Sequence, residues 1–137
     1  MSRAREAVDE RRAAVAALGK DLSRRARSRC ELCGEGGSLS VVEPGPVPEA
    51  PDVARALLLC ARCAGLCATP AARPLPADEG LRFLATSIWA ELPIAQALAV
   101  RLCRRVPAAW AREALDGLYL EPEIEALTDG VEPPPAD

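Results

Sequence analysis

The sequence contains no histidine, a single lysine (Lys20) and very few aromatic residues. Phe, Trp and Tyr together make up 3% of the 137 residues. Without histidine there can be no Ser-His-Asp triad, no Cys-His nucleophile pair and no histidine-ligated catalytic zinc. Histidine is also the usual proton carrier near neutral pH. The composition therefore argues against an enzyme.

Long apolar runs are missing as well. Hydrophobic residues make up 50% of the chain, but no run approaches the roughly 20 residues that a membrane helix needs. The opening segment, MSRAREAVDERR, has no apolar stretch of the kind that signal peptides carry. We expect a soluble cytoplasmic protein without membrane contacts, whose core is built from Ala, Leu and Val.

Positive charge is concentrated near the start of the chain. Residues 1–30 carry nine basic and four acidic side chains, whereas residues 31–137 carry eight and sixteen. A run so rich in arginine could contact nucleic acid or an acidic partner. Because the acidic remainder would repel phosphate, we favour an ordinary solvated helix.

Apolar spacing and proline positions divide the chain into successive segments. The predicted fold class is α+β, mostly α, in which a short β run at Leu39 to Val42 belongs to a small hairpin with helices before and after it. The predicted segments are a basic helical arm (1–29), a four-cysteine module (30–68), a Pro-rich linker (69–77), a helical segment (78–128) and a disordered tail (129–137).

Local signals refine the helical predictions. The arm reads as a helix over residues 3–18 and a shorter piece capped by Asp21. A helix capped near Asp78 follows the linker, and Pro93 suits the first turn of the next. The apolar positions of that next helix recur every four residues, and we expect the aromatic residues nearby to pack against such faces. These positions are Ile94, Leu98 and Leu102, and the aromatic residues are Trp89, Trp110 and Tyr119.

Four of the six cysteines form two CxxC pairs. Cys30 with Cys33 and Cys60 with Cys63 suit a tetrahedral zinc ion, because each turn directs two thiolates toward one point. The pairs are 26 residues apart, longer than usual, and the Pro-rich loop absorbs the excess. A cytosolic chain is a poor place for disulfides. We therefore predict structural zinc, with an iron–sulfur cluster and bare or disulfide-linked thiols as the alternatives.

The other cysteines and two arginines belong to the same hypothesis. Cys67 lies one helical turn after Cys63 and could replace one of the ligands, but we favour a small buried apolar residue. Cys103 is expected to fill the core. Arg29 and Arg62 flank the predicted ligands and could offset the charge of −2 on a four-thiolate zinc site, with backbone N–H groups as the rival donors.

Several segments together resemble the PhnA-like family, named after the alkylphosphonate-utilisation operon. They occur in the order SRCELCGEGGSLSVVEP, LLLCARC, SIWAELPIAQALAVRL and WAREALDGLYLEPEIEAL, and the resemblance covers roughly residues 21–128. It implies an N-terminal zinc module similar to the treble-clef core of HNH endonucleases, in which a CxxC turn, a hairpin, a second CxxC and a helix follow one another.

The chain departs from these families where they carry histidine. Val42 and Glu43 stand at the place of the nuclease histidines, and Gly80 and Leu81 replace a His–Trp pair of the PhnA-like family. Glu43 is the one remaining candidate base, and a single carboxylate does not make a metal-dependent nuclease. The chain also ends without the C-terminal β domain of longer family members. The resemblance therefore implies a shared scaffold without the chemistry.

Three functions follow, in order of preference. The first is a non-catalytic zinc-binding adaptor that binds a protein partner through its helical surface. The second is nucleic-acid binding through the arginine-rich arm. The third is an enzyme of phosphonate metabolism, which would need cationic groups converging on an oxyanion. The best available are Arg82, Arg101, Arg104 and Arg105, and we expect these to form a solvated helix face instead.

Overall fold

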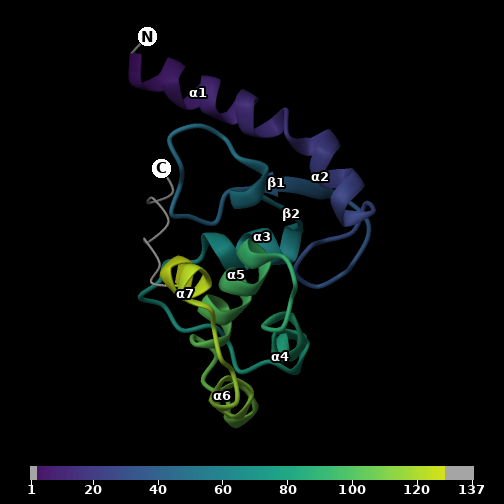
Figure 1. Cartoon of the computed structure of the whole chain (residues 1–137), viewed down its shortest axis with the longest axis vertical. Helices are drawn as coiled ribbons and strands as arrows, with labels where there is room; N and C mark the ends of the chain where they lie inside the picture. Colours follow the sequence, from purple (N-terminus) through teal and green to yellow (C-terminus); the bar gives the residue numbers. More distant parts are fainter. Residues whose placement is uncertain (1–2, 129–137) are drawn as a thin grey trace.

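The computed structural model describes residues 3–128 and has the predicted fold class, α+β and mostly α (Figure 1). Residues 129–137, predicted to be disordered, lie outside the described residues. The elements are α1 (Arg3–Ala16), α2 (Gly19–Ala26), β1 (Leu39–Val42), the 3₁₀ turn η1 (Val53–Arg55), β2 (Leu57–Cys60), α3 (Ala61–Ala68), the 3₁₀ turn η2 (Glu79–Leu81), α4 (Leu84–Ser87), α5 (Pro93–Cys103), α6 (Ala109–Asp116) and α7 (Pro122–Thr128).

The hairpin of β1 and β2 separates two layers of helices. The strands are antiparallel, with Leu39 opposite Cys60 and Val42 opposite Leu57. Because side chains alternate between the faces of a strand, Leu57 and Leu59 enter the main core, while Leu58 packs with residues of α2. Helices α1 and α2 lie on one side of the hairpin, and α3 to α7 lie on the other (Figure 1).

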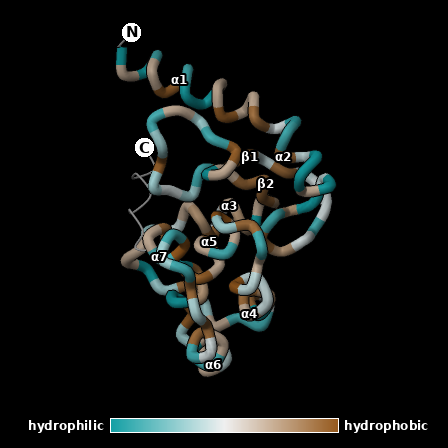
Figure 2. Tube along the Cα trace, in the orientation of Figure 1, coloured by the Kyte–Doolittle hydropathy of each residue, from teal (hydrophilic) through white to brown (hydrophobic). Residues whose placement is uncertain are grey.

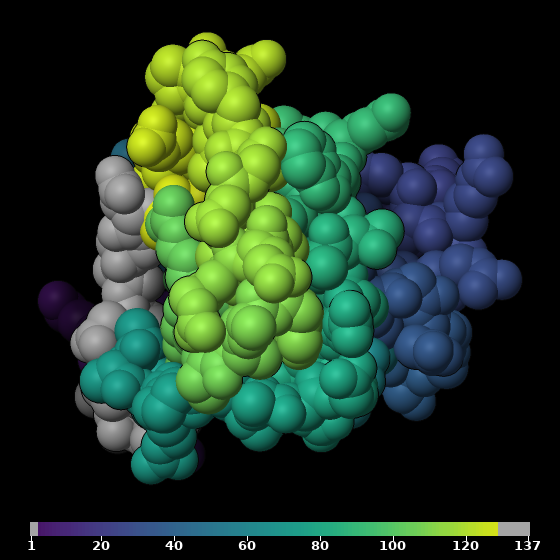
Figure 3. All heavy atoms as spheres, turned by 90° about the horizontal axis from the view of Figure 1, so that it is seen from below, coloured from purple at the N-terminus to yellow at the C-terminus, as the bar shows by residue number. Residues whose placement is uncertain are grey.

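Helix α5 forms the centre of the main core. Ile94, Leu98 and Leu102 are buried, as their spacing predicts, and Pro93 occupies the first turn as expected. Buried alanines and Val100 lie between them, so α5 is apolar on nearly every side (Figure 2). A helix apolar all round must be enclosed. In the view from below, the yellow-green C-terminal helices cover the green and teal middle of the chain (Figure 3).

Two predicted helix caps differ from the structure. Asp21 lies inside the first turn of α2, and the residue before that helix, Leu18, makes no side-chain cap. Asp78 does act as a cap, since its Oδ1 accepts a hydrogen bond of 2.8 Å from the Gly80 N–H, but it caps η2. The helix predicted there is divided into η2 and α4, which still bury Leu81 and Leu84.

The predicted packing of the aromatic residues is wrong for two of three. Trp89 is 58% exposed and Tyr119 is 79% exposed, whereas Trp110 packs partly buried against the main core. Trp89 follows the short helix α4, and Tyr119 lies between α6 and α7. Helical spacing therefore does not carry their side chains onto an apolar face. Cys103 is 1% exposed, as expected of a core residue.

The predicted module and the helical segment share one apolar core. Cys30, Leu57 and Cys63 belong to the same buried cluster as Leu98 and Ala111. Between them, the Pro-rich segment is bonded to the turn that follows α5, where the Leu75 N–H donates to the Arg105 carbonyl at 2.9 Å. Within residues 3–128, none of the helices combines the length and apolar composition that a membrane span requires.

An ion pair between an exposed arginine and a buried carboxylate joins α2 to the turn before β1. Arg25 donates to both carboxylate oxygens of Glu31 at 2.8 Å, and to the carbonyls of Val53 and Ala56. The Glu31 side chain is only 6% exposed, and its Oε1 also accepts the Leu58 N–H at 2.9 Å. A buried carboxylate is tolerated when it is paired and hydrogen-bonded in this way.

We expect Arg25→Ala to destabilise the protein by about 2 kcal/mol, because it leaves the Glu31 carboxylate buried without its cation. The measurement is urea-induced unfolding followed by circular dichroism. Arg24→Ala is the matched control, since Arg24 is on the same helix, is exposed, and has no side-chain hydrogen bond or ion pair among the described residues. Equal stability of the two variants would show that the pair contributes nothing.

Candidate metal centre

The four predicted ligands come from two turns that the hairpin brings together. Cys30 and Cys33 lie in the turn between α2 and β1. Cys60 is the last residue of β2, and Cys63 is in the first turn of α3. The order of turn, hairpin, turn and helix is the one expected of a treble clef. Because Leu39 pairs with Cys60, the register of the hairpin sets the two turns side by side.

The four sulfur atoms converge on one point. All of them lie within 4.8 Å of one another, and Cys33 Sγ is 3.7 Å from Cys60 Sγ. A tetrahedral site with Zn–S bonds near 2.3 Å would place its sulfurs about 3.8 Å apart. Cys30 and Cys63 are buried, and Cys33 and Cys60 are partly exposed. The group can therefore hold a metal ion at the edge of the core.

Backbone geometry fixes the first turn. The N–H of Gly34 donates to the Cys30 carbonyl at 2.9 Å, and the N–H of Cys30 donates to the Glu35 carbonyl at 2.8 Å. Gly34 has φ +85°, in the left-handed region that favours glycine. The glycine after the second cysteine thus closes the tight turn that the sequence predicts.

The thiols are coupled through hydrogen bonds. The hydrogen bond with Cys63, helped by the backbone N–H groups of Leu32, Cys33 and Cys60, lowers the pKa of Cys30 to about 4, although burial opposes this shift. The same pairing raises the pKa of Cys63, and burial raises that of Cys33. These hydrogen bonds favour the thiolate form of Cys30, and metal ligation requires cysteine in that form.

Arg62 is the cation beside the cluster. The neighbouring Cys33 thiol raises the pKa of Arg62, and the guanidinium also lies 4.8 Å over the Phe83 ring and donates to the Gly80 carbonyl at 3.1 Å. Arg29 instead donates to the Gly34 carbonyl at 3.3 Å. Of the two arginines that we expected near the ligands, only Arg62 thus acts on a sulfur, together with backbone N–H donors.

Glu31 and Ser87 support the site, although sequence reasoning did not single them out. Glu31 follows the first ligand, and its N–H donates to the Leu58 carbonyl at 2.8 Å. Ser87 Oγ, on α4, donates to the Leu32 carbonyl inside the first turn at 2.6 Å. A glutamate within CELC and a lone serine in an apolar helix are weak signals, because their partners are backbone atoms distant in sequence.

The two other cysteines lie outside the sulfur cluster. Cys67 does not belong to the group of four. Burial raises the pKa of its thiol, and the nearby charges of Arg101 and Arg105 offset only part of that rise. Cys103 Sγ faces the Ala111 carbonyl at 3.8 Å. Within residues 3–128 the group that could hold a metal ion therefore consists of the four cysteines that the spacing predicts.

Glu43, the one carboxylate considered as a base, is occupied elsewhere. Arg11 on α1 donates to Glu43 Oε1 at 3.1 Å and also to Oε2, and the carboxylate side chain is 12% exposed. Glu43 is not part of the cysteine group. The Glu43 carboxylate therefore anchors α1 to the loop after β1.

The C-terminal arginines do not converge on one pocket. Arg101 donates to the Pro44 and Gly45 carbonyls at 3.0 and 2.9 Å, and burial lowers its pKa. Arg105 donates to the carbonyls of Pro70 and Arg73. Arg82 pairs with Glu79, and Arg104 is exposed. The expected solvated face is therefore wrong for Arg101 and Arg105, which hold loops against α5.

We expect Cys33→Ser to abolish stoichiometric metal binding, because three thiolates would remain at a site built for four. Cys67→Ser is the matched control and should bind the metal as the unaltered protein does. The measurement is the metal-to-protein ratio after purification, with cobalt substitution to detect thiolate coordination. Loss of metal from the Cys67 variant alone would contradict the ligand set.

Arg62→Ala should weaken metal binding by about tenfold, because it removes the cation nearest the thiolates. Arg29→Ala should leave the affinity unchanged, since its guanidinium contacts a carbonyl. Competition with a chromophoric chelator gives both affinities. If Arg29→Ala weakened binding as much as Arg62→Ala, the assignment of Arg62 would be wrong.

Comparison with known proteins adds no relative from which a role can be transferred: no family model, no curated protein and no solved structure matches this chain.

Proposed function

We propose that this protein is a zinc-stabilised, non-catalytic adaptor of the PhnA-like kind, and that its ion is structural Zn²⁺. The observation that carries the proposal is the convergence of four cysteine sulfurs within 4.8 Å, from two turns on the same hairpin. The resemblance to the PhnA-like family adds support through the segments that surround these ligands.

The donor set favours zinc among the metals. Four thiolates in a tetrahedral arrangement suit Zn²⁺ or an iron–sulfur cluster. Zinc is the better fit to one point of convergence, because a cluster carries several metal and sulfide atoms and needs a wider cage. Cys30, Cys33, Cys60 and Cys63 would hold the ion and leave no position open for substrate or water.

The rest of the site supports a role in binding rather than catalysis. A structural zinc ion can supply much of the folding free energy of a small module. Glu43 is committed to Arg11, and no histidine is available for proton transfer. The chain would then act through its surface, with a protein as the favoured partner.

We expect a strong chelator to unfold the hairpin region and to lower the melting temperature, because the ligands lie in the main core. Circular dichroism and thermal melting measure this, and added Zn²⁺ should restore both. The Cys67→Ser variant is the control. Unchanged spectra and melting after complete metal removal would eliminate the structural role.

The metal-loaded protein also tests the alternative function, nucleic-acid binding. Binding to single- or double-stranded nucleic acid that weakens steeply with salt would favour the arginine-rich arm as a nucleic-acid surface. No binding at low salt would leave the adaptor as the proposal. Filter binding across a salt series, with a tRNA, a DNA duplex and a single strand, distinguishes the two.

A further inference from the structure

The two edges of the hairpin differ. Glu31 closes the outer edge of β2: its N–H donates to the Leu58 carbonyl at 2.8 Å, and its carboxylate accepts the Leu58 N–H at 2.9 Å. One residue thus satisfies both outward backbone groups of Leu58, as a neighbouring strand would do.

The edge of β1 is open. Val41 lies opposite Leu58, whose backbone groups point away from β1. In an antiparallel pair, two residues directly opposite each other point their backbone groups either both inward or both outward. The N–H and carbonyl of Val41 therefore point outward, as do those of Leu39 two residues earlier. Among residues 3–128 these groups have no hydrogen-bond partner.

An apolar groove adjoins β1, and its lining also includes Ser23 of α2 and Leu58 of β2. It has a volume of about 850 Å³ and lies between α1 and β1. Val8 and Val15 line the helix side, and Leu39 and Val41 line the strand side. Val8 is 54% exposed, so an apolar side chain on α1 is left open to an occupant.

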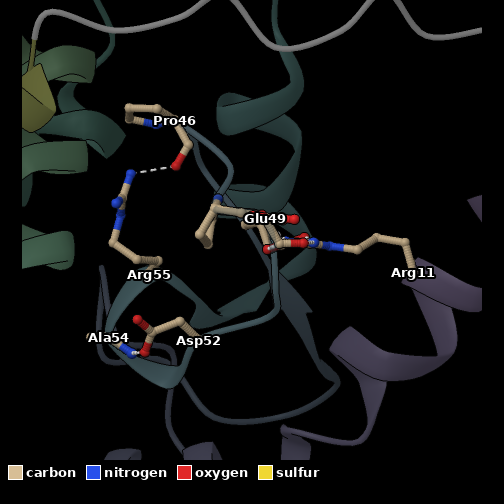
Figure 4. Close-up of polar contacts among 8 residues, drawn as sticks. Arg11, Pro46, Glu49, Asp52, Ala54 and Arg55 are labelled. Carbon is tan, nitrogen blue, oxygen red and sulfur yellow. Dashed lines mark hydrogen bonds and ion pairs between the residues drawn. The ribbon is translucent and has the colours of Figure 1, made fainter.

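Arg11 lines the groove and ties α1 to the loop after β1. Beyond its pairing with Glu43, it donates to the Glu49 and Pro48 carbonyls at 2.6 and 2.8 Å. Figure 4 shows its side chain extending from α1 toward the loop that carries Glu49. Its charge is thereby neutralised.

Arg12 supplies the remaining charge of the groove. It lines the same helix wall, is exposed, and has no side-chain partner among the described residues. Since Glu43, the acidic residue of the lining, is paired with Arg11, the groove presents one unpaired positive charge beside an apolar floor and an open strand edge.

From these observations we propose that the β1 edge binds an extended, acidic segment of a partner protein as a third strand. The backbone of the segment pairs with Leu39 and Val41, its apolar side chains enter the groove, and a carboxylate meets Arg12. This is strand addition to a sheet edge, in which the main chain supplies affinity and alternate side chains supply specificity. The inference rests on the proposed adaptor role and gives that role its surface.

The probe is a fluorescent eight-residue peptide of alternating Glu and Val, titrated into the zinc-loaded full chain. We expect saturable binding by anisotropy, with amide shifts in NMR spectra at Leu39 and Val41. Replacing every Glu of the peptide by Lys should abolish binding. Two further peptides carry N-methyl groups on the odd or on the even backbone nitrogens. Only one of them should lose binding, because only one set of N–H groups faces β1.

Variants test the helix wall. Arg12→Glu and Val8→Asp should each lower the affinity for the peptide about tenfold or more. The controls are Arg112→Glu and Val53→Asp, which change exposed residues elsewhere and should leave the affinity unchanged. Circular dichroism shows whether each variant is folded. Equal binding by all four variants, or equal sensitivity to methylation at both sets of nitrogens, would overturn the proposal.

Two other occupants would also overturn it. A concentration-dependent dimer in sedimentation, lost in Val8→Asp, would identify a second copy of this chain at the edge. Equal binding by a short DNA single strand would identify a general polyanion surface. Because the zinc-dependent melting is measured separately, failure of the peptide to bind rejects this surface alone, and failure of the metal tests rejects the zinc role alone.

Discussion

The convergence of four cysteine sulfurs is the constraint on which the rest of the fold depends. A two-stranded hairpin has marginal stability in water, and this hairpin has only four residues in each strand. With so few aromatic residues, the surrounding core consists mainly of aliphatic side chains, most of them leucine, isoleucine and alanine. Cys30 and Cys63 belong to that core, so a cation at the sulfurs would link the hairpin, α3 and the turn after α2 at one buried point.

Glu31 transmits this constraint to the rest of the molecule. It is adjacent to a ligand, closes the edge of β2, and pairs with Arg25 on α2. The position of α2 is thus tied to the turn that carries the ligands. On the other side, Ser87 ties α4 to the same turn through the Leu32 carbonyl. The site is therefore a junction between the two helical layers, and this supports a structural role more than a catalytic one.

The sequence predicts what depends on local pattern. Each CxxC pair is a local turn, and the period of Ile94, Leu98 and Leu102 is that of a helix; the structure agrees with both. Trp89 and Tyr119 were mispredicted because their elements end before the helical period reaches them. Arg25, Arg101 and Arg105 bind carbonyl oxygens far away in the chain. Every residue has a carbonyl, so such contacts leave no trace in residue type or spacing.

The open edge of β1 follows from the short side chains that α1 places beside it. Proteins usually cover a strand edge, and α1 runs beside this one without filling the space. The helix presents Ala7, Val8 and Val15 toward the strand, and these side chains are short. Arg11 reaches Glu43 and the following loop from the same face, so a long polar side chain sets the separation that small apolar ones would otherwise reduce. A leucine or phenylalanine at position 8 would occupy the groove, and the valine there leaves it open to a strand from another chain.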